Sequence, residues 1–383
     1  MIERVKYQQK IGQLFGIHNA VAILGPRQCG KTTLAHEYAR QVAGTKEIHV
    51  FDLENPLHVE QLQNPQATLK PLSGLIVIDE IQYLPNLFPI LRVLIDDPSL
   101  EQQYLILGSA SRDLIRQSSE TLAGRIAYIE LHPFGIDEIS DWEKLFVLGG
   151  FPKSYLASTN ELSWQWRENY VRTYLERDIP NLGFSVPPAT MRRFWMMLAH
   201  YHGQIFNASE IGRSLGQSDK TIKQYLDILA GTFMVRVLQP WFENIGKRQV
   251  KRPKIYFTDS GLYHYLINTI DLKTLRRHPK LGASWEGFAL EQVIRAYDFS
   301  SENCFFWSTH GQAEIDLLVF DKGRRLGFEF KYTDVPKATA SVYNSLEALQ
   351  LDQVQIVYPG DRSFNLAPKI KAVSLMSLAN SAA

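Results

Sequence analysis

Short apolar runs alternate with segments of helical periodicity over the first third of the chain. The apolar runs occupy residues 20–24, 47–53, 75–80, 104–110 and 127–131. Each has the length of a buried strand, and the segment 34–42 between the first two repeats its apolar positions as a helix does. Strands that alternate with helices predict a mainly parallel, doubly wound sheet.

The middle of the chain changes to helical segments. Residues 161–183 mix aromatic and charged side chains at helical spacing and predict a helical linker that ends before the prolines of 185–190. A shorter helix then ends at Gly216, and another begins near Ser218. The positions expected to face inward are Ile211 and Leu215 in the first helix and Ile222, Leu226 and Leu229 in the second. Two helices joined by a short glycine-bearing turn predict a helix-turn-helix.

The last third carries charged residues on apolar segments. Residues 281–297 predict an amphipathic helix, and 304–320 lead into a strand that carries Asp316. A polar turn joins this strand to a second one, which places Glu329 and Lys331 on one face because side chains alternate with a period of two. Charges on a core-facing hairpin are costly unless they pair or bind a metal ion, so the hairpin is a candidate site.

The first apolar run leads directly into a phosphate-binding pattern. Residues 25–33 read GPRQCGKTT and are followed by a helix, which is the context of a P-loop. Gly25 and Gly30 let the backbone wrap phosphates at the helix N-terminus, where free N–H groups favour anions. We expect Lys31 to reach the outer phosphates and the Thr32 hydroxyl to ligate magnesium. A chance glycine loop is the alternative. The candidate nucleotide contacts are Gly25, Pro26, Arg27, Gln28, Cys29, Gly30, Lys31, Thr32 and Thr33.

Polar side chains end two further strands of the predicted sheet. Asp79 and Glu80 end the third apolar run. We expect Asp79 to hold magnesium and Glu80 to orient or deprotonate an attacking water. Ser109 follows the fourth run and is a candidate sensor of the γ-phosphate or of that water. A helix cap formed by Ser109 or Ser111 is the alternative.

These segments resemble the AAA-superfamily ATPases predicted in prokaryotes that carry a C-terminal domain of unknown function. The motifs that carry the resemblance are, in order, GPRQCGKTTL, VIDEIQYLP, ILGSAS, LAGR, LHPFGIDEI, GGFP and YLERDI, and they span nearly the whole chain. In such ATPases an arginine near the place of Arg125 often reaches the nucleotide of a neighbouring subunit. The resemblance therefore implies a catalytic role for Arg125 in an oligomer, and a structural salt bridge is the alternative.

A basic segment follows the helix-turn-helix. Residues 243–254 lie between two β-like runs, and a basic hairpin in this place is similar to the wing of a winged-helix domain. The candidate nucleic-acid contacts are Lys220, Lys223 and Gln224 on the second helix and Lys247, Arg248, Lys251 and Arg252 in the wing. The alternatives are a protein-interaction lid on the ATPase and a merely solvated basic run.

The C-terminal pattern resembles the restriction-endonuclease-like fold written PD-(D/E)xK. A helix Glu286, a strand Asp316 and the pair Glu329-x-Lys331 follow its order, although no proline precedes Asp316. In that fold Asp316 and Glu329 would ligate one or two magnesium ions, Glu286 would complete the metal shell and Lys331 would position a water. Two alternatives stay open: a structural ion pair, and a fold retained without activity.

Composition limits the partners, the cysteine chemistry and the cellular compartment that the protein is expected to have. The net charge of +1 means that a nucleic-acid surface must be a local patch. Cys29 and Cys304 are the two cysteines of the chain and provide neither a disulfide framework nor zinc spacing. No apolar run approaches a membrane-spanning length, and residues 1–10 lack the apolar core of a signal peptide. We therefore expect a cytoplasmic protein with no membrane partner.

The expected fold class is α/β, with a P-loop doubly wound parallel sheet followed by a winged-helix domain and a restriction-endonuclease-like α/β domain. The expected boundaries are 1–145 for the ATPase, 146–188 for the helical linker, 189–270 for the winged helix and 271–383 for the nuclease-like domain. We expect a magnesium-dependent ATPase that acts on DNA, with ATP and Mg²⁺ as cofactors and a homo-oligomer or a protein partner. The alternative is a nucleotide-switched protein-interaction or regulatory module without nuclease activity.

Overall fold

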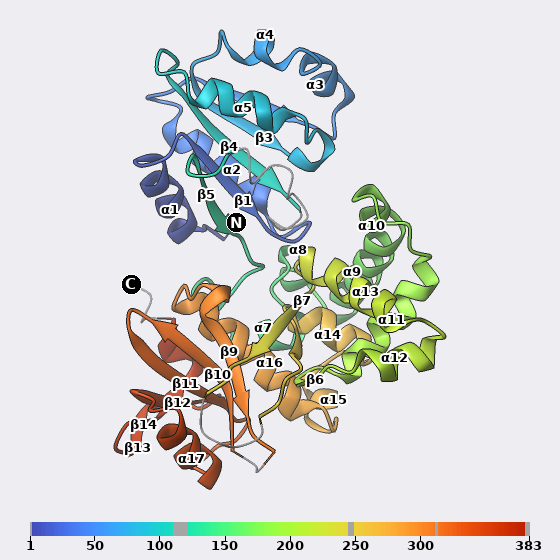
Figure 1. Ribbon diagram of the computed structural model, residues 1–383, viewed down its shortest axis with the longest axis vertical. Coiled ribbons are helices and arrows are strands. Elements are labelled where there is room, and N and C mark those ends of the chain that lie inside the picture. The colour runs from blue at the N-terminus through green and yellow to red at the C-terminus, as the bar shows by residue number, and fades with distance from the viewer. Residues whose placement is uncertain (1, 110–121, 244–248, 311–312, 380–383) are drawn as a thin grey trace. The chain divides into compact units, whose positions relative to one another are not determined.

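The computed structural model describes residues 2–109, 122–243, 249–310 and 313–379. The chain divides into two compact units, each built around its own sheet (Figure 1). Unit 1 comprises Met1–Pro133 and Gly231–Phe233, and unit 2 comprises Phe134–Ala230 and Met234–Ala383. Within the described ranges, no helix has the length and apolar character needed to cross a membrane.

Unit 1 contains a five-stranded sheet in which every neighbouring pair is parallel. Its spatial order is β2-β3-β4-β1-β5. The strands are β1 (Ala20–Leu24), β2 (Ile48–Asp52), β3 (Gly74–Asp79), β4 (Gln102–Gly108) and β5 (Ile126–Glu130). The five apolar runs of the sequence all form strands, and the predicted parallel sheet is confirmed.

Helices cover both faces of this sheet, as a doubly wound fold requires. They are α1 (Val5–Phe15), α2 (Lys31–Val42), α3 (Pro56–Gln61), α4 (Pro65–Leu69), the 3₁₀ turn η1 (Ile81–Tyr83) and α5 (Leu87–Ile95). The helix α2 contacts β3 and β4, whereas Leu87 and Leu91 of α5 pack with Ile76 and Ile106 in one buried cluster. The strands β1 and β4 are buried on both faces, which is why they read as continuous apolar runs.

The strand order decides which side chains meet. The strand β4 lies between β3 and β1, with Leu24 opposite Gly108 and Ile78 opposite Ile106. Because all three strands are parallel, their carboxyl ends lie at the same edge of the sheet. The P-loop, the acidic end of β3 and Ser109 therefore come together.

Unit 2 begins with helices. They are α7 (Trp142–Leu148), α8 (Pro152–Tyr155), α9 (Asn160–Thr173), the π turn η2 (Tyr174–Asp178), α10 (Ile179–Asn181) and α11 (Pro188–His200). The helical segment predicted over 161–183 is thus confirmed as α9, η2 and α10. Arg167 of α9 is fully buried and donates to the carbonyl oxygen of Gly261 at 2.9 Å, so this segment packs into unit 2.

The next segment forms two helices and a small antiparallel sheet. Its helices are α12 (Ala208–Leu215) and α13 (Asp219–Gly231), and its strands are β6 (Gln204–Ile205), β7 (Val235–Pro240) and β8 (Lys254–Phe257). Gly216 ends α12 with a φ of 66°, a left-handed conformation that glycine adopts without steric cost. Ile211, Ile222, Leu226 and Leu229 are buried as predicted, whereas Leu215 is only partly buried. The strand β8 pairs with both β6 and β7.

This small sheet continues into a larger one. In the described residues it belongs to a nine-stranded sheet of order β13-β14-β12-β11-β10-β9-β7-β8-β6. The added strands are β9 (Cys304–Ser308), β10 (Glu314–Asp321), β11 (Arg324–Phe330), β12 (Gln353–Tyr358), β13 (Phe364–Ala367) and β14 (Ile370–Ser374). The join is the parallel pairing of β7 with β9, where Gln239 and Pro240 face Phe305 and Phe306. One sheet therefore contains strands from both sides of residue 270.

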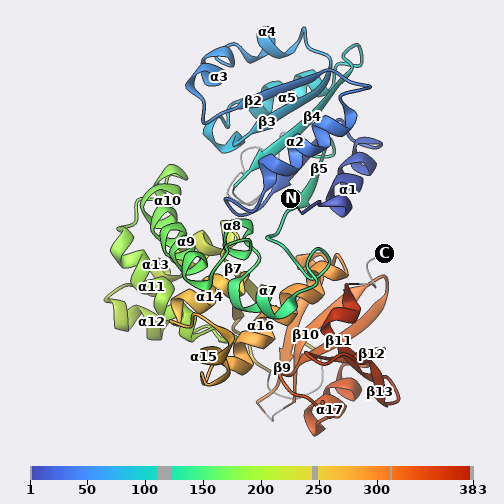
Figure 2. The same ribbon diagram turned by 180° about the vertical axis from the view of Figure 1, so that it is seen from behind.

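The predicted hairpin is β10 and β11, joined by a tight turn in which Lys322 and Gly323 have positive φ. The accompanying helices are α14 (Ser260–Leu266), α15 (Leu272–Arg276), α16 (Leu281–Ala296) and α17 (Ala340–Ala348), with the 3₁₀ turns η3 (Ser301–Asn303) and η4 (Leu375–Leu378). The helix α17 packs against β10 and β12, and α16 packs against β11 (Figures 1 and 2). The helix predicted over 281–297 is therefore confirmed as α16. Its predicted amphipathic character is wrong, because residues 287–296 are all buried and the helix is enclosed on every side.

Candidate functional site

The P-loop is shaped by two glycines with different roles. A Cβ atom on Gly25 would lie 2.1 Å from the carbonyl oxygen of Leu131, so only glycine fits beside that backbone. Gly30 has a φ of 102° and is the N-cap of α2. The loop between them thus turns tightly onto the N-terminus of a twelve-residue helix, which is a site that favours anions.

Lys31 is held inside this loop. Its ammonium group donates to the carbonyl oxygens of Gly25 at 3.1 Å and Pro26 at 3.0 Å and to the Ser109 hydroxyl at 3.1 Å. The residue is only 4% exposed. All three hydrogen-bond partners are uncharged oxygens, and the nearby Asp79 carboxylate interacts with the ammonium group through its charge alone. This is the arrangement that a bound phosphate requires.

The oxygen donors expected for magnesium are adjacent. The Thr32 hydroxyl donates to Asp79 Oδ2 at 2.6 Å. Burial raises the pKa of the Asp79 carboxyl, and the hydrogen bond from Thr32 opposes that rise. A hydroxyl and a carboxylate are the hard oxygen ligands that Mg²⁺ prefers, so these two residues fit the ion that a P-loop implies.

Glu80 adopts a backbone conformation that is unusual for a side chain of its size. Its φ and ψ are 55° and 48°, in the left-handed region. Its carboxylate accepts hydrogen bonds from the Ser109 hydroxyl at 2.9 and 3.2 Å and from the side-chain amide of Gln82. The backbone N–H of Ser109 lies 3.4 Å from Gln82 Oε1. Ser109 therefore connects Lys31 to Glu80, whereas Ser111 lies outside the described residues.

Gln82 was not among the site residues expected from the sequence. Its place two residues after Glu80, in the motif DEIQ, was the available signal. Arg4 was also missed, and no motif marks it. It is 5% exposed and donates to the carbonyl oxygens of Cys29 at 3.3 Å and His132 at 2.9 Å, so it fixes the P-loop from behind.

The remaining P-loop residues divide between surface and core. Arg27 forms an ion pair with Glu54 at 2.7 Å. Gln28, Thr32 and Thr33 are exposed, as contacts to a nucleotide require. Cys29 is fully buried, and that burial raises the pKa of its thiol. Cys29 therefore contributes packing and backbone groups rather than a reactive sulfur.

Arg125 lies just before β5 and is paired within its own unit. Its guanidinium meets the carboxylate of Asp96, the C-cap of α5, at 2.5 and 2.8 Å. This is the geometry of the salt bridge that was the alternative to a catalytic role. A role toward another subunit stays a prediction.

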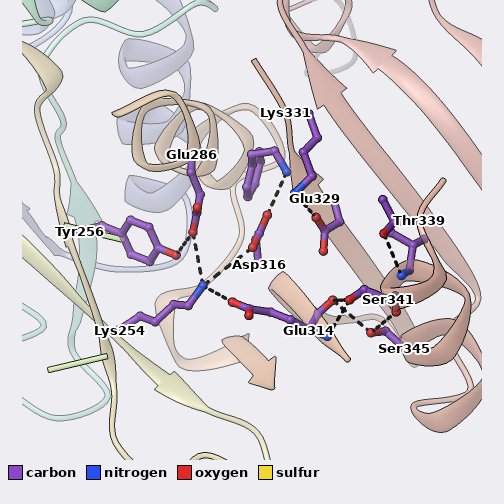
Figure 3. A network of polar contacts seen from close by, with 12 residues as sticks. Lys254, Tyr256, Glu286, Glu314, Asp316, Glu329, Lys331, Thr339, Ser341 and Ser345 are labelled. Carbon is purple, nitrogen blue, oxygen red and sulfur yellow. Dashed lines mark hydrogen bonds and ion pairs between the residues drawn. The ribbon is translucent and has the colours of Figure 1, made fainter. Parts of the chain in front are cut away.

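Carboxylates of the hairpin in unit 2 and of α16 gather around Lys254. In the sequence this lysine ends the basic segment 243–254 that was expected to form the wing. Figure 3 shows Lys254 of β8 pointing between three carboxylates. Its ammonium nitrogen lies 2.5 Å from Glu314, 3.4 Å from Glu286 and 3.8 Å from Asp316. The hydroxyl of Tyr256, two residues along β8, donates to Glu286 at 2.5 Å. We call these five residues the Lys254 cluster.

Burial and neighbouring charges change the pKa values of the residues in the Lys254 cluster. Burial opposes the charge on Lys254, but Tyr256 and the carboxylates hold the pKa of its ammonium well above the ordinary value. Burial and the nearby Asp316 raise the pKa of Glu286 to about 7, and Lys254 opposes this rise. The second oxygen of Asp316 accepts from the backbone N–H of Phe330 at 3.1 Å.

Glu329 and Lys331 form a separate pair beside the cluster. Their side chains meet at 2.8 Å, with the carboxylate buried and the ammonium side chain 45% exposed (Figure 3). Burial and the charge of Asp316 raise the pKa of Glu329 to about 8, although Lys331 opposes the rise. The expected E-x-K geometry is therefore present as an ion pair at the end of β11.

The carboxylates expected as one metal shell are not gathered around a single point. In the part of the chain that the structure describes, no group of three or more His, Cys, Asp and Glu residues is placed to hold a metal ion. Glu286, Asp316 and Glu329, expected as one metal shell, are instead divided between two lysine partners. Lys254 and Lys331 therefore offset part of the negative charge of these carboxylates. Metal-assisted cleavage at the hairpin stays a prediction.

The expected nucleic-acid contacts that the structure describes are all exposed. Lys220, Lys223 and Gln224 lie on the outer face of α13, and Lys251 and Arg252 immediately precede β8. Two further candidates in the wing, Lys247 and Arg248, lie outside the described residues. Exposure on a helix and an adjoining loop is compatible with phosphate contacts and equally with a solvated surface.

Comparison with known families divides the chain into three parts. Residues 18–140 match a family described as an AAA domain. Residues 139–273 and 281–378 match two domains of unknown function, DUF8612 and DUF4143. The AAA match agrees with the P-loop geometry of unit 1, so this part is an AAA-type P-loop ATPase domain.

Two mycobacterial proteins are similar along almost the whole chain. They are the uncharacterized protein Rv2008c of Mycobacterium tuberculosis and the uncharacterized protein Mb2031c of Mycobacterium bovis. Each is 47% identical over 361 residues, which cover 93% of this chain and 80% of the relative. Among solved structures, the Walker-type ATPase PABY2304 of Pyrococcus abyssi matches 70% of this chain and 96% of its own length, with a TM-score of 0.50 and 14% identity. That similarity shows a shared fold.

Proposed function

The chain belongs to the family of Rv2008c and Mb2031c and carries an AAA domain ahead of two domains of unknown function, and from this premise we propose that it is a magnesium-dependent ATPase. The observation that carries the proposal is the continuous hydrogen-bonded path from Lys31 through Ser109 to Glu80. It joins a phosphate-binding cation that follows β1 to a carboxylate that follows β3, by way of Ser109 at the end of the intervening β4.

Each residue of this path has a distinct role in hydrolysis. Lys31 binds the outer phosphates with a charge that its present partners leave uncompensated. The Glu80 carboxylate orients the attacking water and accepts its proton. Ser109 touches both groups, so it couples the presence of phosphate to the position of Glu80. A magnesium ion held by Thr32 and Asp79 would supply charge neutralisation at the phosphates.

We also propose DNA as the target. The two helices α12 and α13 with the strands β6, β7 and β8 have the order of a winged-helix domain, and basic side chains project from α13 and from the loop before β8. A nucleotide-switched regulatory module without nuclease activity is the second candidate. The lysine-compensated carboxylates of unit 2 favour it over a nuclease.

A trans role for Arg125 would extend the proposal to an oligomer. The carboxylate of Asp96 accepts hydrogen bonds from both Nε and Nη2 of Arg125. Arg125 must therefore leave Asp96 before it can reach a neighbouring nucleotide. Nucleotide binding within one subunit does not depend on that exchange.

Separate roles for Lys31 and Glu80 can be tested by calorimetry. Lys31→Ala should weaken ATP binding by about tenfold or more, because it removes the buried cation of the loop. Glu80→Gln should bind ATP with wild-type affinity, because Thr32 and Asp79 are intact. Titration of both variants with ATP and Mg²⁺ measures this difference. An equal loss of affinity in the two variants would refute the assignment.

A further inference from the structure

The Lys254 cluster contains three carboxylates that point at one position, and that position holds an ammonium group. The nitrogen of Lys254 lies within 4 Å of oxygens from Glu314, Glu286 and Asp316. Glu314 and Glu286 lie within hydrogen-bond distance of this ammonium group, whereas Asp316, at 3.8 Å, acts on it through its charge. Carboxylates are also the ligand type that hard metal ions prefer, although among the described residues these three are not placed to hold such an ion directly.

The lysine is fixed there by the sheet rather than by a flexible arm. Lys254 is the first residue of β8, where its backbone pairs with Ile205 and Leu238. Its side chain is 7% exposed, and its ammonium group lies 5.5 Å from the centre of the Phe306 ring on β9. A solvated surface lysine would show neither feature. The burial of the ammonium group is compensated by its carboxylate partners.

The partners come from separate parts of unit 2. Glu286 lies on α16, and Glu314 and Asp316 lie on β10, whereas Lys254 belongs to the strand that follows the wing. The parallel pairing of β7 with β9 places β8 close enough for this contact. The cluster therefore ties the small sheet beside the two helices to the C-terminal hairpin.

We propose that Lys254 is the built-in cation of this carboxylate cluster, that it supplies the positive charge which a bound divalent cation would otherwise provide, and that it locks the helix-turn-helix segment and the C-terminal hairpin into one metal-independent body. The cluster lies wholly within unit 2, so this inference stands or falls independently of ATP hydrolysis.

Thermal melting of the full chain tests the metal independence. The experiment uses nucleotide-free protein carrying Asp79→Asn, which removes the carboxylate expected to bind magnesium in unit 1. Adding Mg²⁺ or Mn²⁺ should leave the melting temperature unchanged, because the cation position of the cluster is occupied. A rise with either ion that disappears when Asp316→Asn is added would overturn the proposal.

Removal of the lysine gives the converse result. In the same background Lys254→Met should lower the melting temperature by about 10 °C, because three partly buried carboxylates lose their cation. Mn²⁺ should recover part of this loss, since the vacated position is now lined by carboxylate oxygens. Lys251→Met is the matched control, because Lys251 is exposed in the same basic run. It should change neither the melting temperature nor the response to Mn²⁺.

A double-mutant cycle keeps the test valid if Lys254→Met folds poorly. Glu314→Gln removes the nearest carboxylate, and Lys254→Met combined with Glu314→Gln should be more stable than the single lysine variant because less charge is left uncompensated. Effects that add independently, or a Lys254→Met protein that responds to Mn²⁺ no more than the control, would contradict the proposal.

Discussion

Lys31 and Lys254 are both buried ammonium groups held by three oxygen atoms, yet their electrostatic states differ. The partners of Lys31 are two carbonyl oxygens and a hydroxyl, which leave its charge available to an anion. The partners of Lys254 are carboxylates, which neutralise its positive charge. The chemistry of the surrounding oxygens therefore suits one lysine to the proposed phosphate contact and the other to the proposed structural role.

A pH dependence follows from Glu329. Its pKa is raised to about 8 in the folded protein, above the ordinary value of a glutamate, so the folded state binds this proton more tightly than the unfolded state. The contribution of the neutral carboxyl is complete at low pH and is lost as the pH rises from about 4.5 to about 8. The unfolding free energy of wild type relative to Glu329→Gln should therefore fall across that window.

Urea unfolding at a series of pH values measures this difference. Glu347→Gln is the matched control, because Glu347 is an exposed carboxyl of the same unit. A wild-type stability that rises relative to Glu329→Gln across the same window would show that the ion pair with Lys331 dominates over burial.

At the scale of elements, the strand order of unit 1 positions the candidate ATPase site. The strand β4 separates β1 from β3, which leaves Ser109 between the P-loop and the acidic end of β3. A sheet in which β1 and β3 were neighbours would place no strand end between Lys31 and Glu80. The hydrogen-bonded path from Lys31 through Ser109 to Glu80 thus follows from the order of the strands.

The helix α13 provides a prediction at the same scale. Lys220→Glu with Lys223→Glu should weaken DNA binding and flatten the dependence of log K on log salt by about 2, because two phosphate contacts release their counterions. Fluorescence anisotropy with duplex DNA over a salt series measures both quantities. Lys322→Glu with Lys337→Glu changes the net charge equally at exposed positions on other segments. Equal losses in the two double variants would identify a non-specific charge effect.

The elements that could be predicted from the sequence are those with local signals. The P-loop is a contiguous strand, loop and helix, and the turn at Gly216 carries its own glycine signature. Lys254 could not be assigned in this way. Its position in a run of basic residues suggested solvent, whereas its burial depends on the pairing of β7 with β9, two strands that lie far apart in the chain. Non-local pairing of this kind leaves no pattern in a single sequence.

For the whole molecule, the two units have different internal organisation. Unit 1 is a parallel sheet whose functional groups meet at one edge. Unit 2 carries one mixed sheet that runs from the small strands beside α12 and α13 to the C-terminal strands. The predicted division at residue 270 treats these as separate domains. That division stays a prediction. The shared sheet and the Lys254 cluster show that strands from both sides of residue 270 are joined within unit 2.

The central claim is that unit 1 hydrolyses ATP through Glu80, and steady-state phosphate release by the full-length protein tests it most directly. Wild type should release phosphate with Mg²⁺ and stop when EDTA is added. Glu80→Gln should be slower by about a hundredfold or more, because the carboxylate that activates water is lost. Glu101→Gln, an exposed carboxyl of the same unit, should retain the wild-type rate. Equal rates for Glu80→Gln and wild type would contradict the account.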